Sequence, residues 1–463
     1  MNAEFLARLQ FSFTIMFHYI FPPFSIGLGF LLIIYESLYL IKKDKVYESI
    51  TRFWIKIFAA CFSIGVASGI VMEFEFGTNW SNYSRFVGDI FGSPLASEGI
   101  FAFFLESGFL AILLFGWNRV KPGVHLFSTL MVCIGSILSA FWIVAANSWQ
   151  QTPVAYQIVP HGDGTRAVIT DFWGMVFNPS SLVRFLHVIT GAILQGTFLV
   201  LSVSAYYYLK NRFIDFAKKA IPIALGVAMA ASIFQLYLGH EHGKIMARYQ
   251  PEKLAAFEGL YKTGSRAPGF IAGYTDPQKG ATHGIHINGL LSYLVYGETE
   301  ATVRGLDQFP REEWPPVTKV FQTYHLMVML GMFFIFISVT GILSLAAKKF
   351  YTTKWFLKTW VLIVPLPVIA NQVGWVSAEL GRQPWLVYGL LKTSQGVSKS
   401  VTANEVLTSL ILFMIVYALL FIVGRYVIDK EIKHGPDLSH TSPAVGYATE
   451  ANRLDFLSKK PEP

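Results

Sequence analysis

The chain alternates between long apolar runs and shorter polar stretches. Nine of the apolar runs are long enough to cross the roughly 30 Å hydrocarbon layer of a bilayer as helices. These runs cover residues 13–41, 53–76, 98–117, 124–146, 183–209, 219–239, 320–347, 357–379 and 405–427. The pattern therefore predicts an all-α integral membrane protein with nine transmembrane helices.

The polar stretches between the spans are short, except for residues 240–319. We therefore divide the chain into four parts: helices 1–6 within residues 1–239, an external segment at 240–319, helices 7–9 within 320–430, and a tail at 431–463. The first apolar run is too long for a cleavable signal peptide and has no basic segment before it. We interpret it as a true span.

Lysine and arginine gather in alternate loops, namely those after residues 41, 117, 209 and 347. Short loops rich in these residues stay in the cytoplasm. The bias predicts an N-terminus outside the cell and a cytoplasmic C-terminus, as nine crossings require. The same bias explains the net charge of +8 without a nucleic-acid partner.

The composition agrees with a membrane protein. Hydrophobic residues make up 53% of the chain and charged residues 14%, whereas soluble domains carry about 25% charged residues. The two cysteines, Cys61 and Cys133, both fall inside predicted spans. We expect them to be small buried apolar residues rather than a disulfide or a metal site.

Several polar residues lie inside or at the ends of the spans, mostly towards the predicted outer face. An ionisable side chain at membrane depth is costly, so it normally faces a cavity, a partner or a cofactor. Histidine and methionine are axial ligands of haem iron, and a buried carboxylate can bind iron or relay protons. The residues of this kind are His18, His187, Met327, Glu98, Glu106 and Glu379.

Each of these residues also has an ordinary explanation. A lone histidine near a helix end usually forms hydrogen bonds at the membrane interface, and methionine commonly fills gaps in packing. Glu98 and Glu106 are eight residues apart, a rise of about 12 Å, so they can follow each other along one side of a helix. We expect His125 and His325 to be hydrogen-bonded rather than ligands. Two paired motifs, "GHEHGK" with His240 and His242 and "HGIH" with His283 and His286, are weaker metal candidates.

One segment has a specific resemblance. The stretch "GWVSAELGRQPW" at 374–385 resembles the signature of subunit I of the cytochrome bd-type quinol oxidases. The resemblance extends over nearly the whole chain, including "EGIFAFFLES" at 98–107, "ANSWQQTP" at 146–153 and "RFLH" at 184–187.

This resemblance implies a respiratory terminal oxidase that contains two haem b and one haem d, or haem b in its place, and no copper. It implies that His187 and Met327 ligate a low-spin haem b, and that His18 and Glu379 ligate two high-spin haems. Members of the family differ in which of these two haems reduces oxygen. The remaining matches are Glu98 and Glu106 in proton delivery, Trp375 between haems and Arg382 beside a haem propionate.

The external segment resembles the quinol-oxidising loop of the short-loop members, some of which are cyanide-insensitive. Within "QPEKLAAFEG", Lys253 and Glu258 match the quinol site. A lysine and a glutamate five residues apart are also common on ordinary surfaces, so only the resemblance singles them out. The chain departs from the family at His325, where some members have an arginine.

The resemblance further implies partners and a location. Subunit I works with a related subunit II and sometimes with a small single-span subunit, in the cytoplasmic (inner) membrane of a prokaryote. Its substrates are quinol, either ubiquinol or menaquinol, and O2. Protons taken from the cytoplasm to form water would generate membrane potential.

Other classes of membrane protein fit the sequence less well. A haem-copper oxidase needs a set of core histidines, but only His18 and His187 lie securely within spans. A cytochrome b of a quinol–cytochrome c reductase needs helices with paired histidines, a pattern that is absent. A non-catalytic homologue would not keep all the matched ligands. The alternative that we retain is a proton- or ion-coupled transporter that uses Glu98, Glu106 and Glu379 as relays, which would be colourless.

Overall fold

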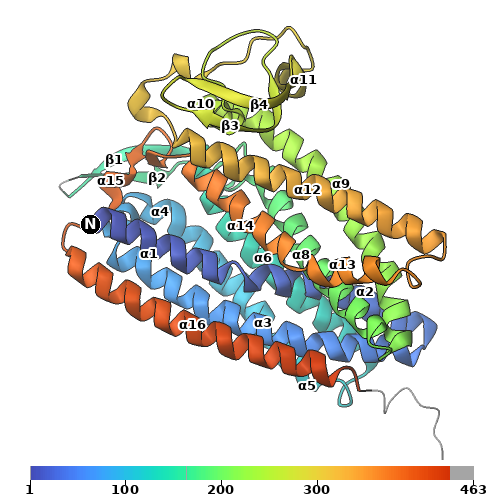
Figure 1. Cartoon of the computed structure of the whole chain (residues 1–463). Coiled ribbons are helices and arrows are strands. Elements are labelled where there is room, and N and C mark those ends of the chain that lie inside the picture. The colour runs from blue at the N-terminus through green and yellow to red at the C-terminus, as the bar shows by residue number, and fades with distance from the viewer. Residues whose placement is uncertain (1, 163, 438–463) are drawn as a thin grey trace, which may run out of the picture.

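The structure is a computed structural model that describes residues 2–162 and 164–437. Figure 1 shows an elongated bundle of long helices with strands and short helices gathered at one end. Within the described residues, nine helical segments are long and apolar enough to cross a membrane, which confirms the predicted number. They are Ala3–Lys42, Lys45–Thr78, Ser81–Phe115, Pro122–Gln151, Ser181–Leu209, Ile214–Tyr249, Val317–Ala346, Lys354–Leu380 and Ala403–His434.

Three of these spans are not continuous α-helices. The first consists of α1 (Ala3–His18) and α2 (Phe21–Lys42), the third of α4 (Ser81–Ser97), η1 (Glu98–Phe103) and α5 (Phe104–Phe115), and the eighth of α13 (Lys354–Leu362) and α14 (Pro365–Leu380). Proline lies in the first turn of α2 and of α14, where its missing N–H does no harm. The η1 segment is a π-helix, a rare form that is frequent at functional sites.

The other six spans are single helices: α3 (Lys45–Thr78), α6 (Pro122–Gln151), α8 (Ser181–Leu209), α9 (Ile214–Tyr249), α12 (Val317–Ala346) and α16 (Ala403–His434). The α9 helix continues ten residues beyond the predicted end at 239, so the "GHEHGK" motif is helical. The predicted tail at 431–463 begins inside α16, and its residues 438–463 lie outside the described part of the chain. In Figure 1 the N-terminus and the end of α16 lie at opposite ends of the bundle.

The segments outside the spans form small hairpins and short helices (Figure 1). They are β1 (Tyr156–His161), β2 (Gly164–Ile169), α7 (Phe172–Val176), α10 (Pro251–Glu258), β3 (Gly269–Asp276), β4 (Ala281–Ile287), α11 (Leu290–Tyr296), η2 (Leu306–Gln308), η3 (Arg311–Glu313), β5 (Trp385–Val387), β6 (Leu391–Lys392) and α15 (Thr393–Gly396). The strands form three antiparallel hairpins, β1–β2, β3–β4 and β5–β6. The α10 helix follows α9 almost directly, which places the predicted quinol-loop residues close to the end of a membrane helix.

The largest buried cluster lies between α2, α3, α8 and α9, where Trp54 and Tyr207 are nearly inaccessible. The α2 and α8 helices meet at glycines: a Cβ atom at Gly27 would lie 2.9 Å from the Cα atom of Gly196. Small residues at such crossings let helix backbones approach closely in a membrane. Cys61 and Cys133 are free and buried, as predicted.

Candidate functional site

An ion pair lies at the end of α14, between Glu379 in the last turn of the helix and Arg382 in the "GRQPW" motif that follows. The Arg382 guanidinium donates one hydrogen bond to Glu379 Oε2 and another, of 3.0 Å, to Gln150 Oε1. Arg382 keeps only 4% of its side-chain surface accessible, whereas Glu379 keeps 34%. The arginine is therefore fixed by its neighbours, while the carboxylate retains an accessible face.

The amides at the end of α6 position the charged side chains around this pair. Asn147 Nδ2 donates to Glu379 Oε1 at 3.2 Å. The Arg184 guanidinium donates to Asn147 Oδ1 and, at 3.1 Å, to Ser148 Oγ. The "ANSWQQTP" motif thus links α14 to α8. Arg184 and Asn147 have no predicted role in the sequence analysis, although a run of polar residues at the end of an apolar helix is a usable signal.

The same motif also reaches the predicted quinol segment. Lys253 Nζ donates to Gln151 Oε1 at 2.8 Å, and the lysine side chain is almost completely buried. Burial lowers the pKa of Lys253 well below its usual range, and the positive charge of Arg184 lowers it further. Three basic side chains, Arg184, Lys253 and Arg382, act electrostatically on one carboxylate, Glu379.

Glu258 lies at the other end of α10 and is also buried. Burial raises the pKa of Glu258 to about 7, although a hydrogen bond with the Tyr324 side chain acts in the opposite direction. The neighbouring Phe257 ring stacks on Tyr324 with ring centroids 4.6 Å apart, which fixes α10 against α12. Gly259 ends α10 at φ +62°, a left-handed conformation that favours glycine.

His187 and Met327 lie on α8 and α12, and each faces a glycine on a neighbouring helix. A Cβ atom at Gly239 of α9 would lie 3.7 Å from His187 Cε1, and one at Gly374 of α14 would lie 2.8 Å from Met327 Sδ. His187 Nδ1 is buried and has no hydrogen-bond partner in the described structure. An imidazole without a protein partner and a thioether given room by glycine suit the His/Met axial ligation of a haem.

His18 is the last residue of α1, immediately before the break in the first span. Its Nδ1 lies 3.1 Å from Ser68 Oγ, and that hydroxyl itself donates to the Ile64 carbonyl at 2.8 Å. His18 Nδ1 is therefore the donor, which leaves Nε2 with its lone pair free for a metal. A Cβ atom at Gly69 would lie 3.2 Å from His18 Cε1, so glycine gives this ring room.

Trp375 connects the His18 region to the charged cluster. Its ring meets Tyr19 edge to face with centroids 5.5 Å apart, and the Arg184 guanidinium lies 5.8 Å from its centroid. The indole is thus held between the break in the first span and α8. Through Arg184, Trp375 is linked to the cluster that contains Glu379, Arg382 and Lys253.

Glu98 and Glu106 form a separate group against α6. Ser139 Oγ donates to Glu98 Oε1 at 2.5 Å. A Cβ atom at Gly135 would lie 3.2 Å from the backbone nitrogen of Glu106. Gly135 and Ser139 are four residues apart and share one face of α6, so both carboxylates line the same side of that helix. In the described structure neither of them has a cationic hydrogen-bond partner.

Two other histidines have the hydrogen bonds that we expected. His325 is buried and lies 2.9 Å from the Phe321 carbonyl and 3.1 Å from the Phe270 carbonyl. His125 Nδ1 lies 2.6 Å from Glu36 Oε1. Among the described residues, no group of three or more histidine, cysteine, aspartate and glutamate side chains is arranged to hold a bare metal ion.

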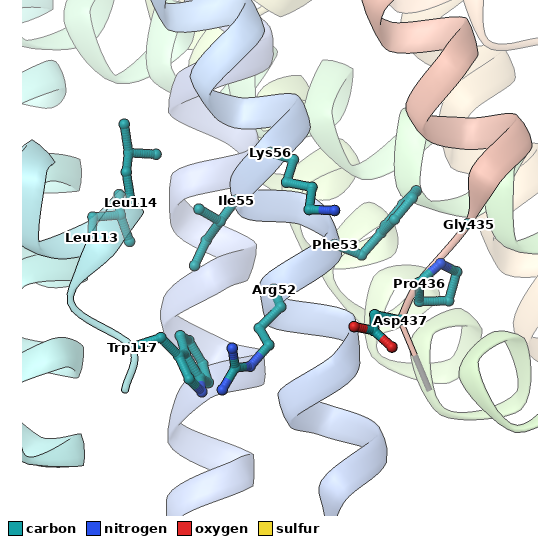
Figure 2. A pocket seen from close by; sticks show the side chains of 10 residues that line it. All are labelled: Arg52, Phe53, Ile55, Lys56, Leu113, Leu114, Trp117, Gly435, Pro436 and Asp437. Atoms are coloured by element: carbon teal, nitrogen blue, oxygen red, sulfur yellow. The ribbon is translucent and has the colours of Figure 1, made fainter. Parts of the chain in front are cut away.

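A pocket of about 190 Å³ lies at the opposite end of the bundle. Figure 2 shows that it is lined by Arg52, Phe53, Ile55, Lys56, Leu113, Leu114, Trp117, Gly435, Pro436 and Asp437. A second pocket, of about 150 Å³, shares Arg52 and Trp117 with the first. None of the predicted ligands lines either pocket, so the candidate site is the cluster at the other end.

The described part of the chain combines nine candidate membrane spans with haem-compatible side chains on α1, α8, α12 and α14. Residues 6–436 match the family model described as cytochrome bd terminal oxidase subunit I. The chain therefore belongs to the cytochrome bd terminal oxidase subunit I family, whose members are respiratory oxidoreductases with haem cofactors. The designation as subunit I implies a second subunit.

Individual relatives agree with this assignment. The chain is 38% identical to cytochrome bd ubiquinol oxidase subunit 1 of Bacillus subtilis (strain 168), over 94% of this chain and 95% of the relative. It is 32% identical to cytochrome bd-II ubiquinol oxidase subunit 1 of Escherichia coli (strain K12), over 93% and 96%. The solved structure of the bd oxidase from Geobacillus thermodenitrificans is similar with a TM-score of 0.88 and 29% identity, over 94% of this chain and 99% of that one.

Proposed function

We propose that the chain oxidises membrane quinol at segment 240–319 and delivers the electrons to three haems, where O2 is reduced to water. The relatives named ubiquinol oxidases support the substrate. The observation that carries the proposal is the cluster in which the basic side chains of Arg184, Lys253 and Arg382 act on the single carboxylate of Glu379. An excess of buried positive charge needs anionic partners, and the carboxylates of haem would supply them.

Four side chains would hold the haems. His187 and Met327 are the proposed ligands of a low-spin haem b, and His18 and Glu379 those of the two high-spin haems, one of which is haem d or a haem b in its place. Bound haem supplies one-electron transfer and, where an axial position is open, an oxygen-binding iron. Arg382 would pair with a propionate in the bidentate manner that suits a guanidinium, and Trp375 would lie between haems.

Lys253 and Glu258 would act on the quinol. With its pKa near 7, Glu258 is poised to accept a quinol proton at neutral pH. Lys253 can donate a hydrogen bond to the other quinone oxygen. Lys253 contacts the charged cluster through Gln151, and Glu258 lies five residues further along the same helix.

Proton uptake from the opposite side completes the proposal. We assign the N-terminus to the outside and the tail to the cytoplasm of a prokaryotic cytoplasmic membrane, with the membrane helices in 1–239 and 320–430. Glu106 and Glu98 then hand protons along α6 towards the haems. Protons released outside and taken up inside generate a membrane potential, and subunit II accompanies this chain.

Quinol-dependent oxygen consumption by the purified two-subunit complex tests this function. We expect ubiquinol or menaquinol to drive oxygen uptake by a coloured preparation whose pyridine haemochrome contains haem b, with or without haem d. A colourless, folded complex that moves ions without consuming oxygen would instead support the transporter.

The proton route has its own test. Glu106→Gln keeps the side-chain size but removes the ionisable group, so turnover should fall by about 100-fold, within the range for loss of a proton-transfer residue. The haem spectrum should be retained. Unchanged oxygen consumption and unchanged proton uptake would show that protons take another route.

A further inference from the structure

The "GHEHGK" motif is not used in the proposed function, yet α9 carries it to the site. Residues 240–242 were predicted to lie outside the sixth span, but they belong to the last turns of α9. His242 lies one turn beyond Gly239, the glycine that faces His187. The motif thus places an imidazole beside a proposed haem ligand.

The side chains of His187 and His242 lie close to each other. The His187 and His242 rings have centroids 6.3 Å apart and planes inclined by 56°. This separation is too long for a direct hydrogen bond between ring nitrogens, and one water molecule can bridge it. The groups that act electrostatically on His242 are Arg184, His187 and Lys253.

If His187 binds haem iron through Nε2, its Nδ1–H needs a hydrogen-bond acceptor. A histidine that binds a metal through one ring nitrogen almost always donates a hydrogen bond from the other, and this second bond sets the tautomer and the basicity of the ligand. His187 Nδ1 is buried and has no partner among the described residues. Arg184, which acts electrostatically on His187, is a donor only. Of these two neighbours of His187, Arg184 and His242, only the imidazole of His242 offers a lone pair.

We propose that His242 is a positioning residue for His187, accepting a hydrogen bond from its Nδ1–H through one bridging water. This contact holds His187 in the tautomer that presents Nε2 to iron and makes the imidazole a stronger electron donor, which stabilises the oxidised haem. The inference rests on the assignment of His187 as a haem ligand in the proposed function.

Redox titration of the low-spin haem in the purified complex tests the proposal. His242→Leu removes the acceptor, so the midpoint potential should shift to a more positive value. His242→Gln keeps an acceptor and should restore the potential towards that of the unmodified complex. His240→Leu, in the same motif, is the matched control and should leave the potential unchanged.

The outcomes separate the two claims. An unchanged or more negative potential in His242→Leu overturns the proposal, and so does loss of the low-spin haem band, which would make His242 a ligand. If the leucine variant does not assemble, His242→Ala provides the same comparison. His187→Ala tests the proposed function separately: if the low-spin haem survives that change, the ligand assignment is wrong whatever His242 does.

Discussion

The two ends of the bundle treat charge differently. At the end with the pockets, Glu48 accepts hydrogen bonds from Lys45 at 2.8 Å and from Arg52 at 2.9 Å, and Lys56 lies 3.4 Å from Glu431. These cations have carboxylate partners from the protein itself. Such pairs need no ligand, and we interpret them as structural.

At the other end, the cluster of Arg184, Lys253, Arg382 and Glu379 joins three basic side chains to one carboxylate. Arg184 donates to Asn147 and Ser148, and Lys253 donates to Gln151, so neither has a carboxylate hydrogen-bond partner in the described structure. Only Arg382 pairs with Glu379. We therefore interpret this cluster, which is completed by amides instead of acids, as a site prepared for anionic ligands.

We call the group of Arg184, Lys253, Arg382 and Glu379 the unbalanced cluster. The largest effect should follow from neutralising its single carboxylate, Glu379. Glu379→Gln removes a proposed iron ligand, so turnover should fall by more than about 100-fold, because loss of a ligand exceeds the 10- to 100-fold cost of losing an outer-shell partner. Oxygen consumption and the haem spectrum check this result. Glu48→Gln is the control, because Glu48 pairs with Lys45 and Arg52 at the opposite end of the bundle, and this variant should keep all haems. Equal loss of haem in both variants would remove the contrast between the two ends.

A smaller effect should follow from removing one unpaired cation. Arg184→Gln takes away positive charge that would face haem carboxylates, so haem retention should weaken by about tenfold. The haem-to-protein ratio after detergent dilution measures this loss. Arg52→Gln at the other end should leave the ratio unchanged. A higher haem content in Arg184→Gln would mean that the positive excess opposes binding.

The smallest effect concerns pH. Because the pKa of Glu258 is raised to about 7, kcat/KM for quinol should rise about threefold between pH 6.5 and 7.5 as this proton acceptor ionises. Glu258→Gln should abolish the rise, while Glu298→Gln, an exposed residue of the same loop, should keep it. The free energy of unfolding changes in the opposite direction. Because the pKa of Glu258 is higher in the folded protein than in the unfolded chain, its contribution to stability is complete below pH 4.5 and is lost as pH rises through about 7. A flat profile in the unmodified complex would exclude Glu258 as the acceptor.

The sequence predicted the spans well because lipid imposes long apolar runs. It did not place the interruptions. Pro22 and Pro365 were visible signals for two of them, but the π-helix at Glu98 has no local signature. The end of α9 was missed because the histidines and charges of "GHEHGK" suggested a loop, whereas the helix continues through them.

The candidate site was only partly visible in the sequence. The resemblance supplied Glu379, Arg382, Lys253 and the proposed haem ligands one residue at a time. It did not show that Gln150 and Gln151 join α14 to α10, because such contacts depend on the convergence of distant segments. The sequence motif "RFLH" contains Arg184, but only its contacts with Asn147 and Ser148 make it part of the cluster.

The central claim is that the unbalanced cluster and the side chains of α1, α8, α12 and α14 hold haem at one end of the bundle. Counting haems per purified two-subunit complex by pyridine haemochrome, before and after His187→Ala, tests it most directly. The account predicts three haems in the unmodified complex and the loss of one low-spin haem b in the variant. A folded complex without haem, or a variant that retains all three, would contradict it.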